Sequence, residues 1–167
     1  MKVDLAALSL SYAKGLAVLD HILGKSVEHF AGSVPENEML EWRLAPDMFP
    51  LRSQVQFVAN LAAQWTARAA GVEVPPSHEG EMDVHELRQA IAQSLAFINS
   101  IERSRFEGRD EQELTVDLVE ITPTMPIGQW MIGFATTNFY FHLTTAYAIL
   151  RSHGVPLGKR DLFAGGL

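Results

Sequence analysis

The sequence predicts an all-α fold: a four-helix bundle with a short irregular or β-ribbon insertion before the last helix. Three observations support this prediction. Apolar residues recur at steps of three and four along four long stretches, as they do on amphipathic helices that share a core. One of the connections is much longer than the others, which fits a bundle with one crossover. With 167 residues, of which 47% are hydrophobic, the chain is expected to form one domain over residues 1–167.

The first two long helices are expected from Asp4 to about His29 and from Pro50 to Gly71. Proline is well suited to a first turn, because its missing N–H has no partner there, and glycine commonly ends a helix. The apolar stripes of these helices are Leu5, Leu8, Tyr12, Leu16, Leu19 and Leu23, and then Leu51, Val55, Val58, Ala62, Trp65 and Ala69. A short helical piece is expected between them, over residues 35–42.

The last two long helices are expected from about Met82 to Ile101 and from about Ile127 to Ser152. The stripe of the third helix is Val84, Leu87, Ile91, Leu95 and Ile98. Between these helices, residues 103–126 contain the pieces ELTVDLVEI and TPTMPI, which predict a short two-stranded ribbon.

Composition excludes several classes of function. Thirteen Lys and Arg face twenty Asp and Glu, and a net charge of −7 repels nucleic acid and anionic lipid, so no nucleic-acid partner is expected. The most apolar stretch, residues 134–150, contains too many polar side chains for a membrane span, so no membrane partner is expected either. The chain has no cysteine, which fits a reducing compartment, and the expected location is the cytoplasm.

Asn138 and His142 are the strongest candidates for a functional site. On a wheel of 100° per residue they fall in the sector that points into the bundle. The full sector is Met131, Phe134, Asn138, Phe141, His142, Thr145 and Ile149. The i, i+4 spacing lets two side chains converge on one point, but the pair offers one strong metal ligand only. We therefore expect no metal and no cofactor; a hydrogen-bonded core histidine is the simpler alternative.

Asp47 is a second candidate, just before the predicted helix that begins at Pro50. Its carboxylate could accept helix N–H groups or pair with a neighbouring arginine, and both roles are structural. The functional alternative is that Asp47 and Gln54 border one pocket with Asn138 and His142.

Large side chains surround most of the predicted last helix. Tyr140, Leu143, Tyr147 and Leu150 lie away from the sector that holds His142. Such a helix needs cover on more than one side. Either neighbouring helices and the C-terminal tail supply it, or a homodimer interface does.

Two motifs carry a family resemblance: LAPDMFPL at 44–51 and NFYFHLTTAYAILRSHGVPLGKRD at 138–161. With them the chain resembles a domain-of-unknown-function family within the DinB/YfiT-like superfamily. The resemblance implies an up-down-down-up bundle, often dimeric, whose better-known relatives hold a divalent metal on three histidines and include thiol-dependent transferases. Their last helix resembles HxxxHRGQ, so His142 is retained and Asn138 replaces the first ligand. Residues 50–70 contain no histidine, and Gln54 or Gln56 is the nearest polar substitute.

Three hypotheses follow. The first is a bundle that binds a small molecule in an interior polar pocket without a complete metal site, with Asp47, Gln54, Asn138, His142 and Thr145 as the binding residues. The second is a divalent-metal-dependent transferase or hydrolase of the DinB type. The third is a structural or interaction protein, in which His142 only satisfies a buried hydrogen bond.

Overall fold

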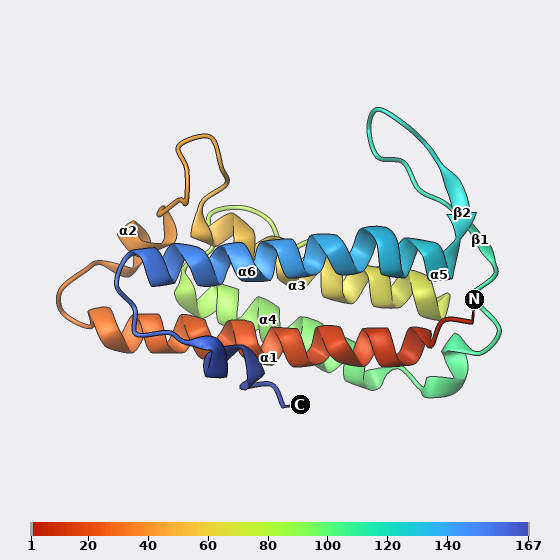
Figure 1. Cartoon of the computed structure of the whole chain (residues 1–167), viewed down its shortest axis with the longest axis horizontal. Helices are drawn as coiled ribbons and strands as arrows, with labels where there is room; N and C mark the ends of the chain where they lie inside the picture. The colour runs from red at the N-terminus through yellow and green to blue at the C-terminus, as the bar shows by residue number, and fades with distance from the viewer. Residues whose placement is uncertain (1, 167) are drawn as a thin grey trace.

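The four predicted helices pack side by side in the computed structural model, which describes residues 2–166 (Figure 1). The long helices are α1 (Leu5–Phe30), α3 (Leu51–Ala70), α4 (Val84–Ser100) and α6 (Thr136–Ser152). The shorter elements are α2 (Glu36–Leu40), η1 (Arg103–Phe106), β1 (Glu113–Thr115), β2 (Thr124–Pro126), α5 (Ile127–Gln129), η2 (Trp130–Ala135) and η3 (Lys159–Phe163). The all-α prediction and the placement of its helices are confirmed.

The helices are arranged in the order that the resemblance implies. α1 and α3 contact each other and both of the remaining helices, so the order around the bundle is α1, α4, α3, α6. The chain colours in Figure 1 show α1 and α6 running one way, and α3 and α4 running the other. Because α3 and α4 are parallel, the segment that joins them travels back along the bundle.

The helix ends follow from their capping residues. Asp4 and Asp83 cap the N-termini of α1 and α4 with their carboxylates. Gly71 ends α3 in the left-handed conformation, with φ of 64°, which glycine adopts without strain. Pro50 precedes α3 as its cap instead of lying in the first turn, so this boundary prediction was one position off.

The predicted ribbon is present before the last helix. β1 and β2 are antiparallel, with Leu114 opposite Met125, and they project from one end of the bundle (Figure 1). Trp130 is fully buried, and its indole N–H donates to the carbonyl of Leu114 at 2.8 Å. This hydrogen bond ties the ribbon to the helix that follows it.

The sequence predicted a regular last helix, but the structure contains a π turn. η2 is π-helical: the backbone N–H of Thr136 bonds to the carbonyl of Met131, five residues earlier. The hydroxyl of Thr136 donates to the same carbonyl at 2.6 Å, and the buried Tyr12 hydroxyl lies 2.8 Å from Thr136 Oγ1. One extra residue per turn shifts the phase of everything before it by about 100°.

This shift corrects the predicted inward sector. Leu143 and Leu150, placed outside that sector, are 3% and 1% exposed, whereas Phe141, placed inside it, is 52% exposed. Asn138 and His142 therefore lie at the edge of the core face of α6, half-buried, instead of pointing into the bundle centre. The prediction failed because Met131 and Phe134 were placed on the same wheel without the π turn.

Two kinds of cover were expected for the last helix: neighbouring elements or a homodimer interface. The structure shows neighbouring elements packed on α6. The C-terminal tail adds Val155 and Leu157 to the core, and η3 packs on α1. Tyr140 and Phe141 keep 39% and 52% of their surface exposed, and the homodimer stays a prediction that light scattering can check. Within residues 2–166, no helix has the length and apolar character that crossing a membrane requires.

Candidate functional site

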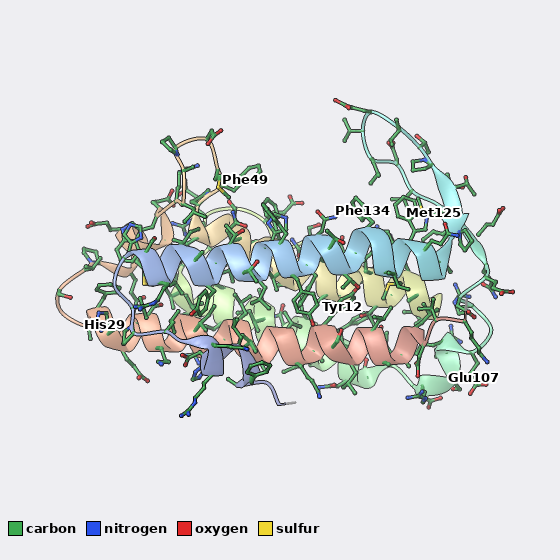
Figure 2. All side chains as sticks on the ribbon, in the orientation of Figure 1. Tyr12, His29, Phe49, Glu107, Met125 and Phe134 are labelled. Atoms are coloured by element: carbon green, nitrogen blue, oxygen red, sulfur yellow. The ribbon has the colours of Figure 1, made fainter. Side chains whose placement is uncertain are left out.

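A groove of about 520 Å³ lies between α3, α6 and the segment that follows α3. We call that segment, residues 72–83, the strap. The groove is lined by Phe49, Gln56, Phe57, Asn60, Leu61, Gln64, Ser77, His78, Glu79, Gly80, Phe134, Asn138 and His142. Figure 2 shows Phe49 and Phe134 on the same side of the bundle, the first on the loop before α3 and the second on η2. The groove thus combines aromatic walls with polar side chains.

His142 is held from behind by a buried amide. Its Nδ1 lies 2.7 Å from Oε1 of Gln54, which is 1% exposed. The other end of this amide, Nε2, donates to the carbonyl of Phe49 at 3.0 Å. A carbonyl can only accept, so the amide must present its oxygen to the imidazole. We infer that the proton of the imidazole sits on Nδ1.

The second ring nitrogen of His142 is left as a hydrogen-bond acceptor. Burial lowers the pKa of His142 from the ordinary value of 6.5, so the imidazole is neutral at neutral pH. With Nδ1 protonated, Nε2 carries a lone pair, and it has no hydrogen-bond partner within residues 2–166. The Phe57 ring packs on the imidazole at a centroid distance of 4.8 Å. A neutral acceptor beside an aromatic wall suits a ligand that donates a hydrogen bond.

Asn138 adds a second acceptor at the same edge of α6. Its Nδ2 donates to the carbonyl of Phe134, four residues earlier, at 2.9 Å. The amide nitrogen of Asn138 thus has a protein partner, whereas its Oδ1 has none among the residues that the structure describes. Asn138 and His142 both line the groove.

The strap forms the third wall, and α3 holds it through a regular series of side chains. Gln56 donates to the carbonyl of Gly80 at 2.9 Å. Asn60 binds the backbone of His78 twice, donating to its carbonyl at 3.1 Å and accepting from its N–H at 2.8 Å. Gln64 donates to the carbonyl of Pro75 at 3.3 Å. Arg52, four residues before Gln56, donates to the carbonyl of Met82.

The spacing of this series has a simple cause. Four residues of an α-helix rise about 6 Å, and two residues of an extended chain cover nearly the same distance. Side chains at every fourth position of α3 therefore meet every second or third residue of a strap that runs the opposite way. The series fixes His78 in the groove wall, where burial lowers its pKa as well. Ser94 of α4 lies 3.4 Å from His78 Nε2.

The structure brings together some of the predicted site residues and not others. His142 and Asn138 line the groove, and Gln54 supports His142 from behind. Asp47 is exposed in the loop before α3 and is not part of the lining, because that loop carries Phe49 to the groove instead. Thr145 is buried one turn beyond His142, and its hydroxyl donates to the carbonyl of Phe141 at 2.7 Å. It is not part of the lining either.

Sequence reasoning missed the strap, including the roles of Asn60 and His78. The signal was present as polar side chains at every fourth position from Arg52 to Gln64. On its own, such a series is typical of a solvated helix face.

A larger hollow of about 690 Å³ lies elsewhere, beside the ribbon. It is lined by Val3, Asp110, Glu111, Met125, Pro126, Gly128, Gln129, Ile132 and Gly133. The carboxylate of Asp110 already accepts the backbone N–H of Val3 at 3.1 Å, which is a structural role. No histidine lines this hollow, so the groove at His142 is the better candidate site despite its smaller volume.

A family model and a solved structure agree with this fold. A family model described as a domain of unknown function, DUF1993, matches residues 7–163. The chain belongs to the DUF1993 family. A crystal structure of a DinB family member protein from Shewanella denitrificans is similar to this DUF1993 chain, with a TM-score of 0.85 and 33% identity over 95% of this chain and 90% of that one. No curated protein matches the sequence.

The metal site that the DinB resemblance implies does not fit this DUF1993 chain. Of three histidine positions one is a histidine, His142; Asn138 stands at another, and Gln54 already spends its oxygen on the His142 proton. Within residues 2–166 no three His, Cys, Asp or Glu side chains are grouped so that they could hold an ion. One imidazole with amide neighbours is a poor donor set for zinc or nickel.

Proposed function

We propose that this DUF1993 protein binds a small molecule in the groove between α3, α6 and the strap, without a metal. The ligand donates a hydrogen bond to Nε2 of His142 and lays an apolar body against Phe57 and Phe134. One observation carries this proposal: the Gln54 amide donates to the carbonyl of Phe49 and turns its oxygen toward Nδ1 of His142. The inferred proton on Nδ1 leaves Nε2 as an acceptor at the groove.

The cost of burying Gln54 supports a binding role over a purely structural one. A buried amide is unfavourable unless its groups are hydrogen-bonded, and Gln54 spends both ends on holding the His142 ring in place. Because His142 is half-buried, a ring nitrogen that lacks a protein partner can reach water or a ligand in the groove. Here one nitrogen is satisfied, and the other borders a groove with aromatic walls.

The test uses a neutral aromatic alcohol, 1-naphthylmethanol, and its methyl ether, which cannot donate a hydrogen bond. We expect the alcohol to bind about two- to tenfold more tightly than the ether, as one hydrogen bond to a partly buried acceptor allows. Affinities are measured by titration calorimetry, and the site is located from amide chemical shifts around His142.

The matched variant is His142→Asn. An asparagine places its amide nitrogen where Nδ1 stood, so the hydrogen bond to Gln54 is kept while Nε2 is removed. The variant should fold like the wild type, and the preference for the alcohol over the ether should vanish. An unchanged preference in the folded variant, or the absence of binding by either probe to the wild type, would contradict the proposed function.

A further inference from the structure

The charges around the groove point to the kind of ligand. Glu79 is the one acidic residue of the lining, and the lining contains no Lys or Arg. The carboxylate of Glu79 is exposed and forms no hydrogen bond or ion pair within residues 2–166. His142 and His78 carry no positive charge to offset it, because burial lowers both pKa values. At neutral pH the one charged side chain of the lining is therefore a carboxylate, within a protein of net charge −7.

The position of Glu79 is fixed although its side chain is exposed. Its two neighbours in the strap are both held by α3: Asn60 binds the backbone of His78 twice, and Gln56 binds the carbonyl of Gly80. The backbone on each side of Glu79 is thus tied to the groove wall, which keeps this residue in the lining of the groove.

The aromatic walls also favour a ligand with a positive charge. The Phe49 and Phe57 rings meet edge to face at 5.1 Å, and Phe57 packs on His142 at 4.8 Å. Phe134 lines the groove as well. Aromatic faces carry negative potential and attract cations that come within about 6 Å. An anion at this place would meet aromatic rings, a carboxylate and an acceptor nitrogen.

We propose that the groove takes an organic ammonium ion joined to an aromatic body, whose N–H donates to Nε2 of His142 and whose charge faces Glu79. This inference rests on the proposed function and adds the chemical class of the ligand. A protonated amine satisfies the acceptor, the carboxylate and the aromatic walls together. A carboxylate ligand has no proton to donate at neutral pH and is repelled by Glu79.

The test compares three probes of nearly equal size: 1-naphthylmethylamine, 1-naphthylmethanol and 1-naphthoate. Titration calorimetry at pH 7.5 and low salt should rank the amine first, the alcohol second and the carboxylate last. We expect the amine to bind at least fivefold more tightly than the alcohol. Added salt should reduce the advantage of the amine and leave the alcohol unchanged, because salt screens exposed charges.

Two variants assign the effect to one carboxylate. Glu79→Gln should weaken binding of the amine about two- to fivefold, the range expected of one exposed ion pair, without changing the alcohol. Glu81→Gln is the matched control, because Glu81 lies two residues further along the strap, is exposed and does not line the groove. It removes the same net charge and should have little effect on either probe.

The outcomes separate this inference from the proposed function. If the alcohol or the carboxylate binds as tightly as the amine, or if the two glutamate variants have equal effects, the ammonium inference is overturned. The proposed function then still stands, provided that His142→Asn abolishes the preference for the alcohol over its ether. If none of the probes binds to the wild type, both fall.

Discussion

Replacing Asn60 tests whether α3 holds the strap, and with it the third wall of the groove. Asn60→Ala removes two hydrogen bonds to the backbone of His78, one at 3.1 Å and one at 2.8 Å. Each such bond contributes about 0.5 to 1.5 kcal/mol, so the variant should lose about 1 to 3 kcal/mol of unfolding free energy. For a chain of this length, about 2 kcal/mol lowers the midpoint of thermal unfolding by roughly 4 to 8 °C.

Two further variants sharpen this prediction. Asn60→Asp keeps the oxygen that accepts the His78 N–H but sets a second carboxylate oxygen against the His78 carbonyl, so it should lose stability while the His78 N–H stays protected from exchange. Asn99→Ala is the control, since Asn99 is exposed on α4, and it should change stability by less than about 0.5 kcal/mol.

Urea unfolding measures the global effect, and amide hydrogen exchange at His78 measures the local one. Exchange of the His78 N–H should be faster in Asn60→Ala than in the wild type, because its acceptor is gone. The account of the strap would be refuted if Asn60→Ala cost no more than Asn99→Ala and left the exchange of His78 unchanged.

Three further predictions concern α3 and the charge on the imidazole. Gly71→Ala should destabilise the fold by more than Gly80→Ala, although both glycines have positive φ. A Cβ at Gly71 would lie 2.5 Å from the Arg109 guanidinium carbon and would displace the hydrogen bond from this group to the Ala69 carbonyl, whereas nothing lies within 4 Å at Gly80. Urea unfolding of the two variants checks this. The free energy of unfolding should fall as pH drops below about 6.5, because burial lowers the pKa of His142 in the folded state and the unfolded chain therefore binds a proton first. The loss should level off below the folded-state pKa, and it should be smaller in His142→Asn. Gln54→Glu should raise the pKa of His142 by placing a carboxylate at Nδ1, and the protonated ring should no longer favour 1-naphthylmethanol over its ether. A nuclear magnetic resonance titration that finds the pKa unchanged would contradict this last prediction.

The sequence was sufficient to predict the helices because their apolar stripes repeat over four or more turns. The stripes of α1 and α3 are almost entirely buried, and Gly71 ends α3 where it was expected. A strong periodic signal of this kind depends on local spacing alone. The short ribbon was also found, because its two pieces lie close together in the chain.

The face of α6 was predicted incorrectly because one π turn changes the phase without changing the residue pattern. The turn coincides with a contact that the sequence does not show: Tyr12 of α1 reaches Thr136, whose hydroxyl binds the carbonyl of Met131. The sequence did predict that Asn138 and His142 share a face. It could not show that this face borders a groove.

The support of His142 was half predicted. Gln54 was named as a pocket residue, and the structure places it behind the imidazole as its hydrogen-bond partner. Asp47 was named with it because it lies just before the helix that carries Gln54, but a loop in that position can turn in many directions. The chain turns so that Phe49, not Asp47, reaches the groove.

The most direct test of the central claim is the protonation state of His142 at neutral pH. A two-bond ¹H–¹⁵N correlation spectrum of the ¹⁵N-labelled protein at pH 7.5 distinguishes the two neutral imidazole forms from each other and from the cation. We predict a neutral ring with its proton on Nδ1, and loss of this signal in His142→Asn. A proton on Nε2, or a charged ring at this pH, would contradict an acceptor at the groove.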